Sequence, residues 1–532
     1  MRGRLTRSLV AILVASPLAV CDPEAGTIEA DPPAEPTAEP FTDGNGWFYH
    51  YVRADGSDYR STPYAAITAR IEEGFYTDRG VSNIMIYAPY EATRDFRGLP
   101  ATDFFDAQVG TGTVRDFEEL VATAHRKGIT VTVYLALLYV DRANPVFRTA
   151  EADRRDGVDS VEASLFRWSR ERPGRAEQPP DFPEYEGGWA FSTTARQWYA
   201  TSWGYPALDY ASPTTRDYVK EVLRFWLDTG IDGIEYDFPL SFLGMTTQDM
   251  TLVDPTMVDI LVTTPTTHTP NAKWLHAEGA GQFWDEGWND DVGFTHVLIN
   301  GDEDRWSFSY AVMDDGPDGR SLTVADLESH WREFFDRRRA RSPSLGVNAW
   351  SLYVDRLTPE QRALDAAVQA GMGALYSIDY EAIYSQLTVA EQTSYDDVFR
   401  ALKRSPALAP GASRVRRPAA ICGGGSADQV YAVERTSTDG TRTVLNVYNF
   451  TDAPQCVTVD LSASPITVPQ TPVDLSTQQN GSPITSASYE VHLPEFGYLF
   501  LDVAAERGVV PFRPTIFLDQ PSIRPPVPGS KR

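Results

Sequence analysis

Eight short apolar runs, most of them separated by stretches with helical spacing, constrain the fold of this chain of 532 residues. The stretch 114–125 is an example, because its apolar residues recur with the spacing of one helix face. Strands that alternate with helices form a parallel sheet, and eight such units close into a barrel. We therefore predict an α/β fold, a (β/α)8 TIM barrel, with strands at residues 47–52, 81–87, 129–138, 231–238, 273–278, 295–300, 345–350 and 374–379.

The chain is too long for one compact domain, and its sequence pattern changes beyond the barrel. We assign residues 44–408 to the barrel and expect an insertion after the third strand, at about 141–205, where the sequence is polar and rich in Trp. Short alternating runs over 412–504 predict a C-terminal β-sandwich domain. Residues 505–532 form a Pro-rich tail.

The N-terminus has the pattern of an export signal, which we assign to residues 1–20. Basic residues precede the apolar run 9–20, which is too short to span a bilayer. The run ends in PLAVC and resembles a bacterial lipoprotein signal, in which Cys21 carries the lipid. Residues 21–43 are acidic and Pro-rich, as in an unfolded tether. We predict an exported lipoprotein of the bacterial cell envelope, bound to the membrane through Cys21, with a secreted protein as the alternative.

The charge and the remaining Cys and His residues limit the partners. A net charge of −27, from 47 basic and 74 acidic residues, argues against nucleic acid, because a duplex repels an acidic protein. The seven His residues show no paired spacing of metal ligands, so we predict no metal site. Cys422 and Cys456 can form a disulfide in an exported protein, although sequence alone does not establish their geometry.

Two of the predicted strands end at a carboxylate. The segment GIDGIEYDFP, residues 230–239, contains Asp237, and WLHAEG, residues 274–279, contains Glu278. Parallel barrel strands end at the mouth of the barrel, where such folds keep their catalytic residues. Two carboxylates at that position are the minimum for cleaving a glycosidic bond, since one attacks or stabilises and the other delivers a proton.

Longer segments resemble the α-amylase family of glycoside hydrolases, from about residue 47 to 503. APYEA and GLPATDFFDAQVGTGTVRDFEELVATAHRKGITV are similar to that family's passage from the second to the third strand. PALDYASPTTRDYVKEVLRFWLDTGIDGIEYDFP is similar to its approach to the nucleophile strand. The resemblance implies that Asp237 is the nucleophile and Glu278 the general acid/base of a retaining enzyme that acts on α-linked oligo- or polysaccharides.

The chain departs from the family's pattern around these carboxylates. Glu235 stands where the family has an Arg, two residues before the nucleophile, and Trp350 ends a run that is Asn-His-Asp in the family. On the third strand, Tyr134, Leu138 and Tyr139 replace an Asp and an Asn-His pair. The family often binds Ca²⁺, but the Asn that helps to bind it is Leu138 here. We therefore expect no required cofactor, and Ca²⁺ is possible but is not supported by the matched motifs.

These replacements affect charge at the predicted nucleophile. Residues 235 and 237 share one face of a strand, because side chains alternate. An Arg would hold Asp237 ionised, whereas the like charge of Glu235 disfavours its ionisation. The Asp of the family's Asn-His-Asp run is a third carboxylate of the site, and this chain has Trp350 in its place. Losing such a group typically lowers the catalytic rate by orders of magnitude. The residues that we assign to substrate binding are Trp350, Asn348, Glu235, Tyr139 and Asp379.

Three interpretations remain open. The chain is a glycosidase with a rearranged site, in which Asp302, Asp379 or Glu381 replaces the lost carboxylate. Alternatively, it is a non-catalytic carbohydrate-binding surface lipoprotein, in which Trp350 stacks on a sugar ring. The third interpretation makes Asp237 and Glu278 ordinary polar strand ends. We favour the enzyme.

Overall fold

The computed structural model describes residues 46–51, 62–93, 98–173, 188–237, 259–270, 274–279, 296–300, 346–350, 357–371, 375–381, 383–409 and 412–505, and the single positions 324, 325, 328 and 373. For most residues of the strands at 46–51, 274–279, 296–300, 346–350 and 375–379, it describes the backbone alone. The predicted export signal, Cys21 and the tether lie outside the described residues, as do Asp302 and most of the Pro-rich tail.

Eight parallel strands form a closed barrel, which confirms the predicted (β/α)8 architecture. Each of the eight predicted runs contains one of these strands or overlaps it. In the order of their pairing around the barrel, the strands are β1 (Gly46–Tyr51), β14 (Leu375–Asp379), β13 (Gly346–Trp350), β12 (His296–Asn300), β11 (Trp274–Gly279), β10 (Gly233–Tyr236), β5 (Thr130–Leu135) and β2 (Val81–Tyr87).

The third barrel strand is shorter than the apolar run 129–138 that predicted it. The Ala136 N–H donates to the hydroxyl of Tyr90, at 3.3 Å, rather than to a neighbouring strand. The carbonyl of Leu138 accepts from the Leu208 N–H at 3.0 Å. The chain therefore leaves the barrel after Leu135 although its residues remain apolar and buried.

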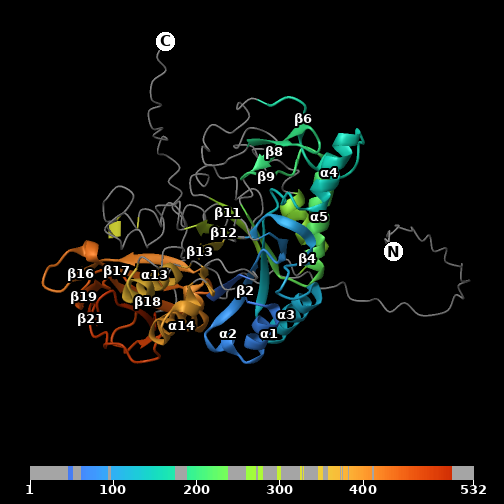
Figure 1. The fold of residues 1–532 in the computed structure, drawn as a ribbon. Coiled ribbons are helices and arrows are strands. Elements are labelled where there is room, and N and C mark those ends of the chain that lie inside the picture. The colour runs from blue at the N-terminus through green and yellow to red at the C-terminus, as the bar shows by residue number, and fades with distance from the viewer. Residues whose placement is uncertain are drawn as a thin grey trace, which may run out of the picture. The chain divides into compact units, whose positions relative to one another are not determined.

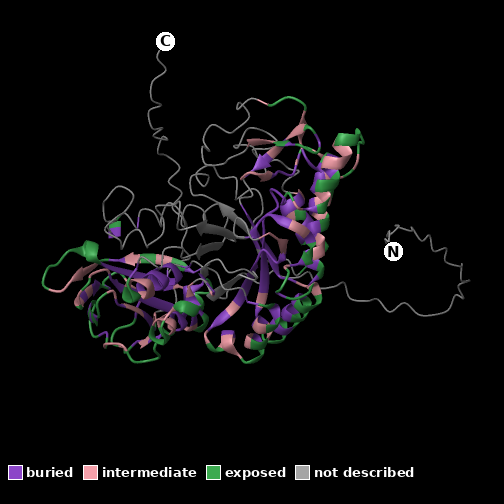
Figure 2. Ribbon diagram, in the orientation of Figure 1, coloured by how far each residue is buried: buried purple, intermediate pink, exposed green. Residues whose placement is uncertain are grey.

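The helices lie outside the strands (Figure 1). Residue Thr113 begins α3 with a capping box, in which its hydroxyl and the Asp116 carboxylate satisfy each other's backbone N–H. Figure 2 shows that the helix faces toward the strands are buried and that the opposite faces are exposed. The described helices are α1 (Tyr64–Glu72), α2 (Phe75–Asp78), α3 (Val114–Arg126), α4 (Pro145–Asp156), α5 (Pro213–Asp228), α8 (Thr264–His268), α13 (Pro359–Gly371) and α14 (Val389–Arg404), with a π-helical turn at Asp259–Thr263.

Two small antiparallel sheets interrupt the alternation of barrel strands and helices. The strands β3 (Tyr90–Ala92) and β4 (Ala101–Ala107) pair with each other. The other sheet lies in the stretch for which we predicted an insertion, and its strands are β6 (Trp168–Ser169), β8 (Gln197–Ser202), β7 (Gly188–Ser192) and β9 (Tyr205–Pro206), which pairs with β8.

The C-terminal region consists of two antiparallel sheets, and its form as a β-sandwich stays a prediction. One hydrophobic cluster draws residues from both sheets, among them Leu445 and Val491. The first sheet has the order β15 (Ser413–Arg417), β17 (Val430–Thr436), β18 (Thr443–Asn449), β22 (Tyr498–Val503) and β20 (Val473–Asp474). The second has the order β16 (Ala419–Ile421), β19 (Gln455–Asp460) and β21 (Ser488–Leu493). Among the described helices, none combines the length and the apolarity needed to cross a bilayer.

Candidate active site

The approach to β10 is fixed by hydrogen bonds to β5 and α3. The Asp232 N–H donates to the carbonyl of Val131 at 2.8 Å, and its carboxylate accepts from the Val131 N–H at 2.8 Å. The same carboxylate oxygen lies 2.8 Å from Nε2 of His125. Beyond the strand, the Asp237 N–H donates to the carbonyl of Leu135 at 3.1 Å. Asp237 therefore stands at the carboxyl end of β10, as the sequence predicts.

The carboxylate of Asp237 receives a phenol hydroxyl at each oxygen. The hydroxyl of Tyr134 donates to Oδ1 at 2.8 Å, and that of Tyr139 donates to Oδ2 at 3.4 Å. All three residues are buried, with Asp237 only 4 % exposed. Donors of this kind stabilise the ionised form of a carboxylate and restrict its orientation.

The two tyrosine rings are themselves held by aromatic neighbours. Tyr134 stacks on Tyr87 of β2, with ring centroids 4.5 Å apart and an interplanar angle of 20°. Tyr139 stacks on Tyr205 of β9, with centroids 5.7 Å apart at 28°. The hydroxyls that contact Asp237 therefore come from side chains that packing fixes in place.

The backbone of Glu278 lies on the strand next to Asp237. The register of β10 and β11 pairs Glu235 with His276 and Tyr236 with Ala277. The next residues along the two strands are Asp237 and Glu278, so their backbones occupy neighbouring positions at the same end of the barrel. The side chain of Glu278 lies outside the described part, and the facing of the two carboxyl groups across the mouth stays a prediction.

Glu235 lies within the barrel wall, two residues before Asp237. It is fully buried, and its backbone pairs with Tyr134 on one side and with His276 on the other. Alternation along the strand gives Glu235 and Asp237 the same face. The adjacent Tyr236 behaves differently, since its hydroxyl donates to the carbonyl of Leu261 at 2.8 Å and burial raises the pKa of its phenol well above the usual value.

Among the other predicted substrate-binding positions, Trp350 and Asp379 end their strands and Asn348 is the middle residue of β13. Asn348 pairs with Leu298, which in turn pairs with Glu278, so the three backbones lie side by side on neighbouring strands. Trp350 is the last residue of β13, and Asp379 is the last of β14. The side chains of Asn348, Trp350 and Asp379 are not among those described.

The structure describes the side chains of two further residues that the sequence singled out, Glu381 and Tyr139. Glu381, proposed as a replacement carboxylate, is 3 % exposed and accepts a hydrogen bond from the hydroxyl of Thr62. Tyr139, proposed as a substrate-binding residue, is fully buried with its hydroxyl directed at Asp237. Its contact with substrate stays a prediction.

Sequence reasoning missed the pairing of Tyr134 with Asp237. In the sequence, Tyr134 stands out only because it replaces an Asp of the family's third strand. The sign of this contact is that β5 and β10 are neighbouring strands. Their register places Tyr134 opposite Glu235, two residues before Asp237. That register comes from the strand pairing, which the sequence alone does not specify.

At the position where the family resemblance places an Asn, Leu138 offers no side-chain ligand for Ca²⁺. Leu138 is fully buried and its side chain offers no oxygen, while its carbonyl already accepts from the Leu208 N–H. Ca²⁺ is bound by oxygen ligands, so this position supplies none from its side chain.

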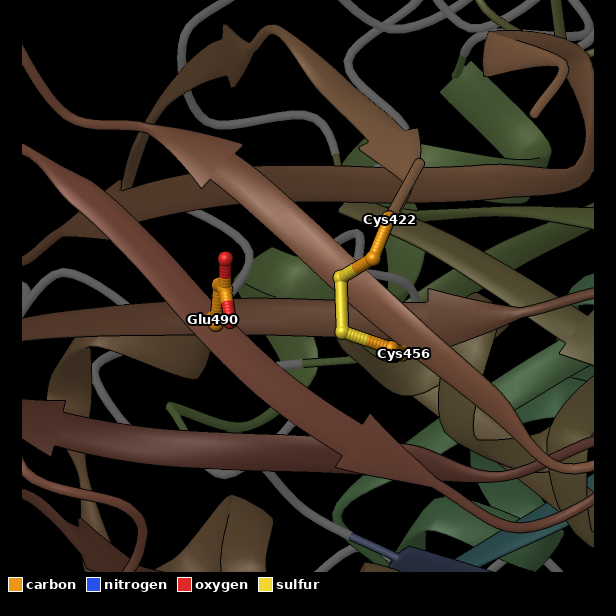
Figure 3. A group of neighbouring side chains, drawn as sticks. All are labelled: Cys422, Cys456 and Glu490. Atoms are coloured by element: carbon orange, nitrogen blue, oxygen red, sulfur yellow. A yellow bond between two sulfur atoms is a disulfide. The ribbon is translucent and has the colours of Figure 1, made fainter. Parts of the chain in front are cut away.

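The described residues contain one cluster with metal-ligand atom types, and it is explained by a disulfide. Cys422, Cys456 and Glu490 approach one another in the C-terminal region (Figure 3). The two sulfurs are joined in a disulfide bond, with the Cα atoms 5.3 Å apart. A disulfide sulfur is not a thiolate, which is the form of Cys that binds metals. This cluster is therefore a covalent link between β19 and the end of β16.

Comparison with known sequences finds matches to two separate stretches of the chain. Residues 75–279 match the family model of the alpha amylase catalytic domain, and residues 426–500 match that of the maltogenic amylase C-terminal domain. Alpha-amylase 3 of Dictyoglomus thermophilum is 27% identical over 143 residues, which are 27% of this chain and 26% of that protein. Trehalose synthase/amylase TreS of Mycobacterium tuberculosis is 29% identical over 216 residues, 38% of this chain and 33% of that protein.

A cyclomaltodextrin glucanotransferase of Bacillus sp. is 28% identical over 190 residues, 34% of this chain and 25% of that enzyme. The matched part thus spans about a quarter to a third of the length of these curated relatives. Solved structures share the fold over most of the chain. Eubacterium rectale Amy13B superimposes with a TM-score of 0.66 at 14% identity, over 87% of this chain and 96% of that one.

The α-amylase from H. orenii also superimposes with a TM-score of 0.66, at 16% identity, over 87% of this chain and 100% of that one. The matched stretches include Asp237, Glu278 and most strands of the C-terminal sheets. They confirm the resemblance seen in the sequence: residues 75–279 are similar to the catalytic domain of the α-amylase family, and residues 426–500 are similar to the C-terminal domain of maltogenic amylases.

Proposed function

We propose that this protein is a glycosidase of the α-amylase type that acts on α-linked oligo- or polysaccharides by a retaining mechanism. The observation that carries the proposal is Asp237, a buried carboxylate at the carboxyl end of β10 that receives one phenol hydroxyl at each oxygen. Its backbone neighbour on β11 is Glu278. The two residues occur in the order and at the strand ends that the family resemblance assigns to nucleophile and acid/base.

The proposed reaction has two displacements at the anomeric carbon. Asp237 attacks that carbon while Glu278 gives a proton to the departing glycosidic oxygen, which forms a glycosyl ester on Asp237. Glu278, now a carboxylate, then takes a proton from water or from a sugar hydroxyl, whose oxygen displaces Asp237. Each carboxylate oxygen has two lone-pair directions, so an oxygen that accepts one phenol hydrogen bond retains a lone pair for attack.

The relatives support this class of chemistry without fixing the acceptor. Their names include an alpha-amylase, a cyclomaltodextrin glucanotransferase and a trehalose synthase/amylase. A similar solved structure is an alpha-amylase complexed with acarbose. Hydrolysis and glycosyl transfer share the first displacement, and the choice between them depends on which hydroxyl reaches the glycosyl ester.

A second candidate function is carbohydrate binding without turnover. The observation in its favour is the complete burial of Glu235, which takes the place of the family's Arg on the face shared with Asp237. A like charge there opposes ionisation of the nucleophile. In this alternative, Trp350 at the end of β13 supplies a stacking surface for a sugar ring.

Turnover assays with matched variants separate the two functions. The purified protein and its Asp237→Asn and Glu278→Gln variants are incubated with maltooligosaccharides and aryl α-glucosides between mildly acidic and neutral pH. A glycosidase releases product, and each variant loses about a thousandfold or more of the rate, because the two groups act as a unit. Asp217→Asn, an exposed carboxylate on α5, serves as the control and keeps the wild-type rate.

A binding protein gives the opposite pattern. It binds a glycan in calorimetry, releases no product, and loses affinity mainly on Trp350→Ala. If the wild type turns over none of these glycosides across that pH range, the glycosidase proposal is wrong and the family relationship alone remains.

We further propose export, with a lipid on Cys21 that anchors the protein to the membrane of the bacterial cell envelope. The basic start, the short apolar run and the acidic Pro-rich segment that follows support this location. Mass spectrometry of the mature N-terminus tests it. An unmodified terminus at another residue contradicts lipidation but leaves secretion open.

A further inference from the structure

We infer that Tyr134 and Tyr139 are positioning residues that together hold Asp237 as an ionised, correctly oriented nucleophile. This inference rests on the proposed function and adds to it a role that the family resemblance does not assign. By the family resemblance, an Arg two residues before the nucleophile would hold it ionised, and this chain has Glu235 there. In this chain the donors to Asp237 are two neutral phenols from β5 and the segment after it, instead of a charged Arg on the strand of the nucleophile.

The geometry gives each phenol a distinct carboxylate oxygen. Tyr134 donates to Oδ1 at 2.8 Å and Tyr139 to Oδ2 at 3.4 Å, so the contact from Tyr134 is the stronger of the two. With both oxygens engaged, rotation of the carboxylate about its last side-chain bond breaks at least one hydrogen bond. The pair therefore restrains the plane of the carboxylate as well as its charge.

The two donors are fixed by different parts of the chain. Tyr134 lies on β5, within the barrel, and its ring stacks on Tyr87 of β2. Tyr139 follows β5, and its backbone bridges to Ala207 in the segment after β9. Its ring stacks on Tyr205, which is partly exposed. The barrel thus holds one donor and the stretch predicted as an insertion holds the other.

Several titratable residues lie close to Asp237 along the backbone of its own and the neighbouring strands. Glu235 lies on its own strand, Tyr134 and Tyr139 come from β5 and the segment after it, and His276 and Glu278 occupy the neighbouring positions on β11. A carboxylate at 235 opposes ionisation of Asp237, whereas hydroxyl donors favour it. Removing a phenol donor should therefore make Asp237 harder to ionise, so that less of the enzyme carries the reactive carboxylate at low pH.

A purely structural role for the tyrosines is the competing explanation. In that case the rings fill the barrel interior and their hydroxyls contribute only to stability. Substitution by Phe keeps the ring and removes the hydroxyl, so it distinguishes the two roles. Tyr210→Phe provides a matched control, because Tyr210 is also fully buried but donates to the backbone carbonyl of Leu137, at 2.7 Å.

The first test measures the kinetics of Tyr134→Phe, Tyr139→Phe and Tyr210→Phe on an aryl α-glucoside. We expect kcat to fall about ten- to a hundredfold in Tyr134→Phe, since a hydrogen bond to a charged group is lost, and to fall less in Tyr139→Phe. KM should change little in either. The acid limb of the kcat/KM profile should move to higher pH in both, and the Tyr210→Phe profile should match that of the wild type.

A second test does not depend on activity. Unfolding of the wild type, Tyr134→Phe, Asp237→Asn and the double variant forms a double-mutant cycle at neutral pH, and the cycle is repeated at acidic pH. We expect coupling between positions 134 and 237 at neutral pH, and weaker coupling once acid protonates the carboxylate. The same cycle between 210 and 237 should show little coupling.

These outcomes separate the inference from the proposed function. Turnover by the wild type with unchanged kcat and pH profile in both Phe variants overturns the inference and leaves the glycosidase intact. Absence of coupling between 134 and 237 overturns it as well. A wild type without turnover overturns the proposed function, and the positioning role for catalysis falls with it even where the coupling is present.

Discussion

The reactivity of Asp237 depends on a balance between its donors and the carboxyl group of Glu235. The phenols of Tyr134 and Tyr139 stabilise a carboxylate, while a negative charge at 235 destabilises it. Glu235 is fully buried, so water screens its effect only weakly. The site therefore combines groups that act on the same carboxylate in opposite directions.

This balance predicts that Glu235→Gln changes the pH profile in the direction opposite to Tyr134→Phe. Gln has nearly the same shape as Glu but no negative charge, so ionisation of Asp237 becomes easier. The acid limb of kcat/KM should move to lower pH, and a thermal melt should verify that the variant is folded. A shift to higher pH, as in Tyr134→Phe, would contradict this electrostatic account.

The sequence predicted the position of Asp237 but not its partners. The run GIEYDF combines apolar residues with a terminal carboxylate, which is sufficient to assign a strand and its end. The hydrogen bonds from Tyr134 and Tyr139 depend on the register of β5 against β10 and on the path of the chain after Leu135. Both are tertiary features that no local pattern specifies.

At the scale of elements, the barrel depends on tight turns between its helices and strands. Gly80 and Gly128 each lie between a helix and the following barrel strand, with φ angles of +81° and +71°. A Cβ at Gly80 would lie 2.7 Å from the backbone carbonyl carbon of Phe399 on α14, whereas one at Gly128 would meet nothing within 4 Å. The first glycine thus allows two elements to approach, and the second only allows the turn.

We therefore expect Gly80→Ala to destabilise the protein more than Gly128→Ala. The Gly128 variant should lose about 1 kcal/mol, because Ala disfavours a left-handed backbone conformation. The free energy of unfolding of the Gly80 variant should fall by about 1–3 kcal/mol more than that, because α14 must shift away from the added methyl group. Denaturant unfolding of the two variants checks this difference. Equal losses would show that the contact with α14 is looser than the structure indicates.

Long apolar elements were predicted more reliably than short ones. The eight barrel strands were all expected, since a strand buried on both sides reads as an apolar run. The pairing of β3 with β4 was not, because its register is irregular and its residues are partly exposed. Such strands are defined by their partners rather than by their own composition.

At the scale of the whole molecule, the C-terminal sheets are attached to the barrel by buried polar contacts. Arg435 on β17 is fully buried, and its guanidinium donates to the carbonyl of Gly371 at 3.0 Å and to that of Ala409 at 2.7 Å. Asn446 on β18 donates to the same Gly371 carbonyl at 2.9 Å. These contacts join the C-terminal sheet to the end of α13, one of the barrel's helices.

We predict that Arg435→Met weakens this attachment and lowers the stability of the protein by about 2–4 kcal/mol, because the Ala409 carbonyl loses this donor and the Gly371 carbonyl keeps only the donor from Asn446. Calorimetry should show a lower unfolding midpoint. Arg442→Met is the control, since Arg442 forms an exposed ion pair with Asp502, and such pairs contribute about 0–1 kcal/mol. Equal effects of the two variants would contradict a special role for Arg435.

The central claim is that Asp237 is the nucleophile of a retaining glycosidase, and trapping the glycosyl ester tests it most directly. The protein is incubated with 5-fluoro-α-D-glucosyl fluoride, whose ring fluorine slows breakdown of the ester while the fluoride leaving group allows it to form. Mass spectrometry of the digested protein then locates the added sugar. We predict an adduct on the peptide that contains Asp237, and none in Asp237→Asn. An adduct on another carboxylate, in a wild type that turns over substrate, would contradict the claim.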